Sequence, residues 1–339
     1  MLVYGLLVLF AGKFSRYFHW ESFLFSFLPK KVKANGLLGI SRSGDGFVLA
    51  QIQLRETGKP LLCLLESAAA GELGSVCEAQ KLGKQPLSMV MEPGDFSLQL
   101  LEAPQVAEDE IRDAVRWKIR DRLDYDVAQA VVDVFEIPGL KEQGRTPLIY
   151  AVCAHEDRLR EYIEQVEPAG MDLRYIDIPE LVQRNIACHL PEDETGLALL
   201  NLQQQSGLLT LTYQSTLFLA RELDSGYQAL AGAGDAALAV NDSPLTLSES
   251  PAEALETVAL EIQRSLDYYE SHFGKPPIKH LLIAPLVQPV PELLEHIRSS
   301  LGLSVRMLDL AEVIEAPVVM DADMQARAFY AIGAALRSE

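Results

Sequence analysis

The chain has 339 residues, of which 49% are apolar, and its formal net charge at pH 7 is −19. This length and apolar content predict a folded protein of about two domains with a sizeable core. The negative charge argues against nucleic acid or an anionic membrane surface as a bulk partner, because both repel a chain of the same sign. The four cysteines have neither zinc-ligand spacing nor the pattern of a disulfide framework, which favours a reducing, cytoplasmic setting.

The first 35 residues are apolar and basic. Residues 1–10 are almost wholly apolar, and a second apolar run, 23–28, is followed by the basic cluster 30–33. Neither run reaches the roughly 20 apolar residues that span a bilayer. Three interpretations stay open: a reading frame that starts too far upstream, with the native start near Ser22; an interfacial anchor; and a signal peptide, although it lacks a basic n-region and a convincing cleavage site.

The next part of the chain predicts strand pairs separated by helices. Residues 36–53 have the pattern of a two-strand hairpin, with glycines in the turn at 43–46. Further strands are predicted over 87–91, 96–101, 131–137 and 148–154, and helices from Glu108 onward and over 156–166. In the first of these helices one face carries the apolar residues Ile111, Val115, Ile119 and Leu123.

After Pro191 a similar pattern begins again. Strands over 197–202, 208–213 and 216–221 predict a second meander. Ser250 and Glu253 form a capping box that starts a long amphipathic helix, which ends at Gly274. A strand over 278–283 and a final helix over 322–336 complete the prediction.

Several residues that could suggest chemistry have simpler interpretations. His155, Glu156 and Asp157 fit a helix start with acidic residues in its first turn better than acid/base catalysis. The segment 320–324 has too few carboxylates for a calcium loop, so Asp321 or Asp323 is expected to cap the last helix. The histidines share no metal-ligand spacing, and the chain contains no Walker, Rossmann or nucleophile-elbow pattern.

Two meander-then-helix lobes, with an α/β unit inserted in the first, match the layout of the actin-like ATPase fold. At the residue level the chain resembles the PilM family of type IV pilus assembly proteins, and within it the members that serve MSHA-type pili. The markers of this resemblance are the segments 102–104, 108–117, 130–135, 260–269 and 331–337.

The resemblance implies an α/β, actin-like (ribonuclease H-like) two-lobed fold with an inserted FtsA-like small subdomain. The first lobe would comprise 36–96 and 171–194, the insert 97–170 and the second lobe 195–320, with a C-terminal helix, 321–339, packed on the first lobe. It also implies a cytoplasmic protein, peripheral to the inner membrane. This protein would grip the cytoplasmic tail of a single-span, PilN-like partner with its first lobe and insert.

The resemblance also locates the degenerate nucleotide site. Relatives hold Mg-ATP with aspartates in two hairpins and a glycine pair near the adenosine. In the first hairpin, Ser41 replaces the aspartate in the run Ser41, Arg42, Ser43, Gly44. In the second, Asn201 and Gln203 replace aspartate and glycine, and Ala284 and Pro285 replace the glycine pair. Arg42 and the turn amides of Ser43 and Gly44 could still contact phosphate.

These replacements predict no catalytic residue, no metal and no cofactor, and therefore an adaptor or scaffold of a pilus assembly platform. Two alternatives from other classes stay open: an ATPase that drives platform assembly, and a secreted or periplasmic binding protein. The cytoplasmic part of a type II secretion L protein is a further relative, against which the absence of a membrane span after Glu339 counts.

Overall fold

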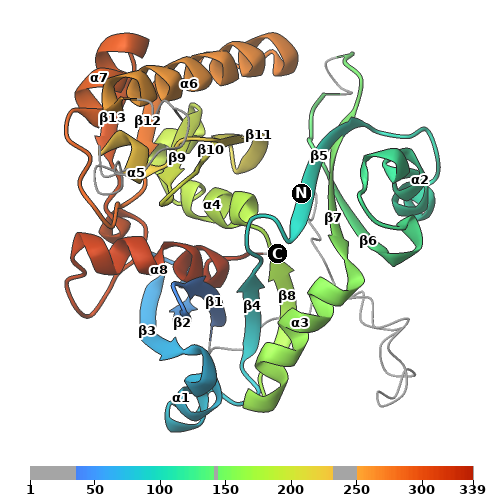
Figure 1. Ribbon diagram of the computed structural model, residues 1–339, viewed down its shortest axis with the longest axis vertical. Coiled ribbons are helices and arrows are strands. Elements are labelled where there is room, and N and C mark those ends of the chain that lie inside the picture. Colours follow the sequence, from blue (N-terminus) through green and yellow to red (C-terminus); the bar gives the residue numbers. More distant parts are fainter. Residues whose placement is uncertain (1–35, 141–143, 232–249, 339) are drawn as a thin grey trace, which may run out of the picture. The chain divides into compact units, whose positions relative to one another are not determined.

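The computed structural model describes residues 36–140, 144–231 and 250–338 as an α/β protein (Figure 1). Two compact units make up the chain: the first runs to Val182 and includes Tyr330 to the end, and the second runs from Gln183 to Phe329. Both divisions fall inside helices, α4 (Pro179–Ala187) and α8 (Ala322–Ala335). The sequence-based boundaries, 194/195 and 320/321, lie just beyond the end of α4 and just before the start of α8. The apolar and basic N-terminal segment lies outside the described residues.

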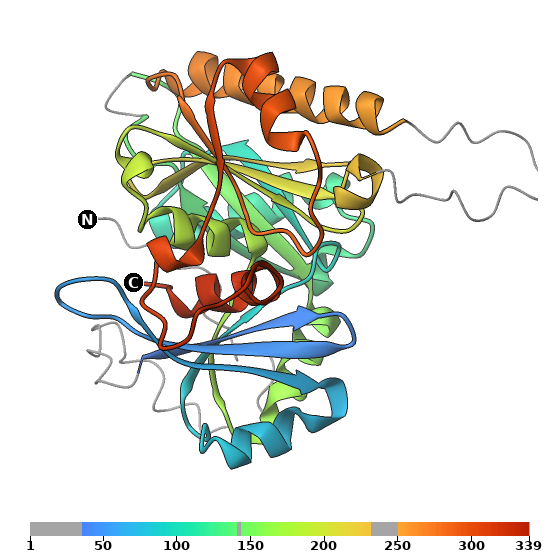
Figure 2. The same cartoon turned by 90° about the vertical axis from the view of Figure 1, so that its left-hand side faces the viewer.

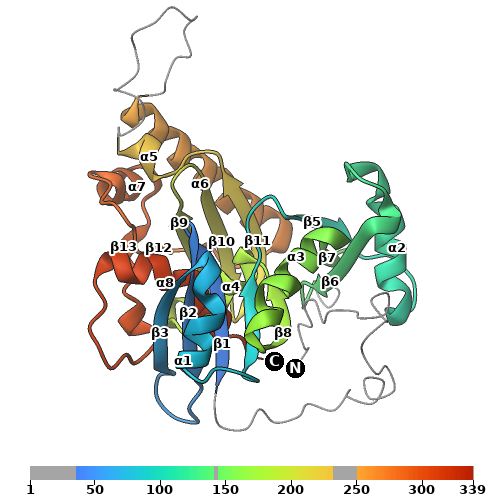
Figure 3. The same ribbon diagram turned by 60° about the horizontal axis from the view of Figure 1, so that its bottom comes forward.

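The first unit is built on a five-stranded sheet with the order β3-β2-β1-β4-β8. Its strands are β1 (Leu37–Ser43), β2 (Gly46–Gln53), β3 (Leu61–Ala69), β4 (Pro86–Val90) and β8 (Asp172–Asp177). The first three strands form an antiparallel meander, and β4 and β8 run parallel to β1. The predicted opening hairpin is therefore confirmed. Sequence analysis missed β3, β8, α4 and the short helix α1 (Leu73–Ala79), which lies against the sheet (Figure 3).

A close helix-to-sheet contact fixes the C-terminal helix in this unit. A Cβ atom at Gly39 of β1 would lie 2.0 Å from the carbonyl oxygen of Ala331 and 2.6 Å from the amide nitrogen of Ala335. Only glycine allows the strand backbone to approach α8 this closely. Asp321 accepts a hydrogen bond from the amide of Met324 and so caps the start of α8, as predicted.

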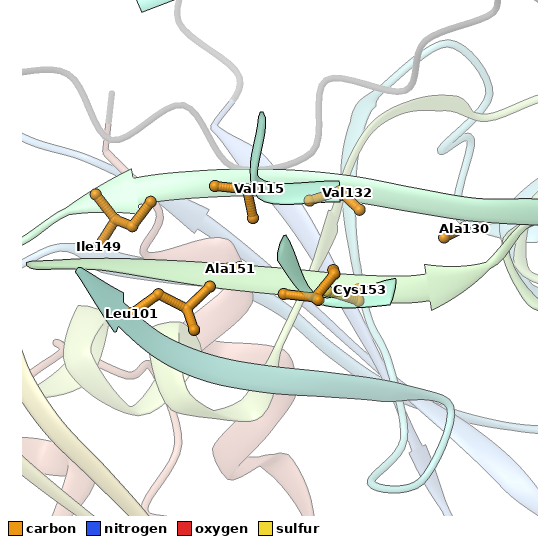
Figure 4. Close-up of a cluster of buried hydrophobic side chains, with 8 residues drawn as sticks. Leu101, Val115, Ala130, Val132, Ile149, Ala151 and Cys153 are labelled. Carbon is orange, nitrogen blue, oxygen red and sulfur yellow. The ribbon is translucent and has the colours of Figure 1, made fainter. Parts of the chain in front are cut away.

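The insert has its own three-stranded antiparallel sheet, with the order β5-β7-β6. Its elements are β5 (Phe96–Glu102), α2 (Ile111–Lys118), β6 (Ala130–Glu136), β7 (Leu148–His155) and α3 (Glu156–Val166). Val115 (Figure 4) and Ile119 are fully buried in an apolar cluster. Ile111 and Leu123 pack at its margin, so the four predicted apolar residues do gather in one cluster. The helix is shorter than predicted, because α2 ends at Lys118 and Leu123 follows in an extended conformation.

The second unit repeats the plan of the first. Its sheet has the order β11-β10-β9-β12-β13, in which an antiparallel meander is followed by two parallel strands. The strands are β9 (Leu197–Leu202), β10 (Gly207–Tyr213), β11 (Thr216–Leu223), β12 (His280–Ile283) and β13 (Ser304–Met307). The helices are α5 (Tyr227–Leu230), α6 (Pro251–Phe273) and α7 (Leu293–Leu301).

Helix α6 lies across one face of this sheet (Figure 2). Its capping box is present, because Ser250 Oγ accepts from the amide of Glu253 and the Glu253 carboxylate accepts from the amide of Ser250. Gly274 ends the helix in the left-handed conformation, with φ at 59°. Tyr269 and Phe273 pack their rings against Phe218 of β11, so Tyr269 is a core residue as predicted.

Candidate functional site

The first predicted nucleotide-binding position, Ser41, lies in the interior of the first unit. Its side chain is 2% exposed, and its Oγ has no hydrogen-bond partner in the part of the chain that the structure describes. Ser88 on the neighbouring strand β4 is also buried without a partner for its hydroxyl. Alternation along β1 and the pairing of Gly39 with Ser88 place both hydroxyls on the sheet face that α8 covers. The Ser41 side chain is short, uncharged and buried, so it offers no negative charge to a metal ion.

Arg42, the next residue, contacts Gln165, Glu92 and Phe47, all in the first unit. Its guanidinium donates to Gln165 Oε1 on α3 at 3.4 Å, lies 4.0 Å from the Glu92 carboxylate and stacks over the ring of Phe47. Ser43 and Gly44 form the hairpin turn, in which Gly44 has a φ of 57°. Arg42, the cation that sequence analysis offered for phosphate, thus contacts α3, Glu92 and Phe47.

A second set of contacts joins α3 to the segment between β4 and β5, and sequence reasoning missed it. The Tyr162 hydroxyl donates to Asp95 Oδ2 and accepts from the amide of Glu92, both at 2.7 Å. Arg158 lies 3.6 Å from the Asp95 carboxylate. Burial, followed by the bond to Asp95, raises the pKa of Tyr162, so this phenol stays protonated and keeps donating. No sequence motif could have revealed this, because the partners are 67 residues apart.

The second predicted loop is held by polar contacts inside the second unit. Asn201 is buried at the end of β9, and Gln203 Nε2 donates to its Oδ1 at 3.3 Å. The Gln203 carbonyl accepts from the amide of Tyr227 at 2.9 Å. A Cβ at Gly226 would lie 2.5 Å from the carbonyl oxygens of Gln203 and Gln204, so a backbone segment occupies the space beside this loop.

Ala284 and Pro285, the residues predicted to stand in place of a glycine pair, follow β12 and are both buried. The amide of Ala284 donates to the carbonyl of Leu200 at 2.8 Å, so this position lies beside the end of β9. The structure therefore brings Asn201 and Ala284 together at one edge of the second sheet, where parallel strands end. A methyl group and a pyrrolidine ring fill the space that glycines would leave open.

These residues do not fit a magnesium nucleotide. Magnesium in such sites is bound through carboxylates and phosphate oxygens, and both acidic positions are uncharged here. In the described ranges, no three histidine, cysteine or acidic side chains gather as a metal ion would require. The four cysteines are free thiols. No reaction step through a bound nucleotide follows from this arrangement.

The two repeated sheets and the inserted unit define the class: the chain has an actin-like ATPase fold, as the resemblance predicted. No protein-family model and no curated protein matches the chain. Among solved structures, the PilM–PilN type IV pilus biogenesis complex contains a chain that is 16% identical, with a TM-score of 0.66. The match covers 89% of this chain and 98% of that one.

Two other solved structures are more distant. The cytoplasmic domain of EpsL, an inner-membrane component of the type II secretion system of Vibrio cholerae, is 12% identical over 87% of this chain and 94% of that one, with a TM-score of 0.45. A protein of unknown function with an actin-like ATPase fold from Bacteroides thetaiotaomicron is 10% identical over 86% and 95%, with a TM-score of 0.44. In the described part of this chain, no helix combines the length and apolar character needed to cross a bilayer.

Proposed function

We propose that this chain is an adaptor of a type IV pilus assembly platform, which binds the cytoplasmic tail of a PilN-like inner-membrane protein and does not hydrolyse ATP. The observation that carries the proposal is the likeness to the PilM–PilN structure, which extends over nearly the full length of both chains. The residue-level markers of the MSHA-type members support the finer assignment to that kind of pilus, the role that MshI has there. The protein would be cytoplasmic and held at the inner membrane through its partner.

The neutral residues at the metal positions support the part of the proposal that concerns hydrolysis. A carboxylate that holds magnesium cannot be replaced in charge by Ser41 or Asn201, and both side chains are buried. The contacts of Arg42 and Tyr162 support a binding role for the first unit, because they hold the insert helix α3 against the first sheet. These contacts would hold α3 and the first sheet in a fixed arrangement to which an extended tail could bind.

Calorimetry on the full chain tests both parts. A synthetic peptide with the N-terminal tail sequence of a PilN-like protein from the same organism is expected to bind with a measurable heat. The same peptide with its apolar residues replaced by serine is the control. Magnesium ATP at millimolar concentration is expected to give no heat. Magnesium-dependent ATP binding with phosphate release would instead favour an ATPase, and absence of tail binding would overturn the adaptor.

A further inference from the structure

The outer face of α2 in the insert carries a tryptophan that the core does not use. The inner face of the helix is filled by Val115 and Ile119, which are fully buried. Trp117 points away from that cluster and is 64% exposed. It is the one aromatic residue among the strongly exposed large apolar side chains of the described segments. Tryptophan and arginine are both enriched at the energetic centres of protein interfaces.

Acidic residues predominate before and at the start of α2, and basic residues at and after its end. The exposed carboxylates Glu108, Asp109, Glu110 and Asp113 share the first region with one cation, Arg112. The cations Arg116, Lys118, Arg120 and Arg122 share the second with Asp121 and Asp124. This order suits the helix dipole.

Only part of this charge is neutralised within the chain. Arg112 pairs with Asp133 at 2.9 Å and Arg120 with Asp121 at 3.1 Å. Lys118 donates to the carbonyl oxygen of Glu102 at 2.9 Å and Arg122 to Gln99 Oε1 at 3.2 Å, and both of these acceptors are uncharged.

We propose that this face is a contact surface between two copies of the chain, with their α2 helices packed antiparallel about a two-fold axis near Val115. An antiparallel copy places the acidic start of one helix against the basic end of the other. Glu110 of each copy then lies opposite Arg120 of its partner, and Trp117 lies opposite Asp113, next to Ala114. Such a contact is self-complementary, as a two-fold interface requires.

The charges of residues 108–122 favour a second copy of the chain over other partners for this face. A uniformly acidic partner would be repelled by residues 108–113, and a uniformly basic one by residues 116–122. The net charge of −19 disfavours nucleic acid and anionic lipid, and it also opposes a second copy, so the local pairing of opposite charges on this face must outweigh that repulsion. One helix face is smaller than a standard interface of roughly 1,600 Å². The dimer is therefore weak and forms at high local concentration, as on a membrane platform.

Sedimentation velocity of the full chain over a range of concentrations tests the proposal. The wild type is expected to show a concentration-dependent dimer. Trp117→Ala is expected to raise its dissociation constant about tenfold or more, and Arg120→Glu is expected to abolish it by setting two carboxylates against each other. The double variant Glu110→Arg with Arg120→Glu restores opposite charges across the axis and is expected to recover the dimer.

Two exposed positions on α6 serve as matched controls: Leu260→Ala and Arg264→Glu are expected to leave association unchanged. A monomer at every concentration would overturn the proposal. So would an association that survives Trp117→Ala and Arg120→Glu, because that would place the contact elsewhere, for example in residues 1–35. This proposal is independent of tail binding, because the tail peptide can bind, or fail to bind, whether or not the chain forms a dimer.

Discussion

At the scale of single residues, close backbone contacts and the cost of buried charge decide which side chains β1 can carry at Gly39 and Ser41. Gly39 and Ser41 lie two residues apart on β1, on the sheet face that α8 covers. The first is required for packing, because any side chain would collide with the α8 backbone. Ser41 is 2% exposed and uncharged, whereas the aspartate expected there from the family resemblance would be an unpaired, costly carboxylate.

Gly39→Ala tests the close approach of β1 to α8. The added methyl group would lie 2.0 Å from a backbone oxygen, so the helix or the strand must move. We expect the free energy of unfolding to fall by about 1 to 3 kcal/mol, the usual cost of overpacking. Urea denaturation gives the measurement. The control is Gly74→Ala in α1, where the space is open, and it is expected to be neutral or slightly stabilising; equal losses for both variants would contradict this account.

Arg337→Ala tests the buried ion pair that follows α8. Arg337 Nη1 lies 2.8 Å from Asp177 Oδ2, the Asp177 side chain is fully buried, and the guanidinium also stacks over Tyr175. Removing the cation leaves a buried carboxylate unpaired, which costs about 3 to 5 kcal/mol. Arg327→Ala breaks an exposed pair with Asp323 on the same helix and is expected to cost at most about 0.5 kcal/mol. Thermal unfolding of both variants should separate them clearly.

At the scale of elements, the sequence pattern predicted the long or regularly alternating segments. Helices α3 and α6, the opening hairpin and the meander of the second unit have regular apolar spacing, and the caps of α6 and α8 are visible as residue types. It missed β3 because its run of leucines does not alternate, and it missed α1 and β8, which are seven and six residues long. The replaced positions of the candidate site stay a prediction that rests on the family resemblance. The contact of Arg42 with Gln165 was not predictable, because 123 residues separate them.

The hairpin turn between β10 and β11 stores strain that its neighbours offset. Gln214 and Ser215 both have positive φ, at 49° and 62°, although neither is glycine. The Asp193 carboxylate accepts from the amide of Ser215 at 2.6 Å, and Arg184 donates to the Ser215 carbonyl at 2.7 Å. Burial raises the pKa of Asp193, so this clamp carries a desolvation cost of its own.

Replacing the turn with Gln214→Asn and Ser215→Gly removes that strain. Asparagine and glycine favour this turn type, so we expect the free energy of unfolding to rise by about 1 kcal/mol. Asp193→Ala is expected to lower stability in the parent, where the clamp is needed. In the chain that carries Gln214→Asn and Ser215→Gly, Asp193→Ala should lower the free energy of unfolding by less than it does in the parent. Urea titrations of the four chains form a double-mutant cycle, and additive effects would show that the clamp does not act on the turn.

At the scale of the whole molecule, the net charge of −19 opposes both compactness and association. Salt screens this repulsion, because the Debye length falls from about 30 Å at 0.01 M to about 10 Å at 0.1 M ionic strength. We therefore expect the Tm to rise over this range of sodium chloride, measured by circular dichroism at pH 7. A falling Tm would mean that the ion pairs, such as Arg306 with Glu192 and Glu312, outweigh the repulsion.

The parallel strands of the two sheets show where β5, α2, β6 and β7 join the first unit. In the second unit, α7 connects β12 to β13 as a plain crossover helix. In the first, α3 has the same place between β4 and β8, and residues 96–155 precede it as an elaboration of the loop. Asp95 and Tyr162 already hold the two ends of that loop together. None of β5, α2, β6 and β7 belongs to the first sheet, so a chain without these four elements would still contain every strand of that sheet.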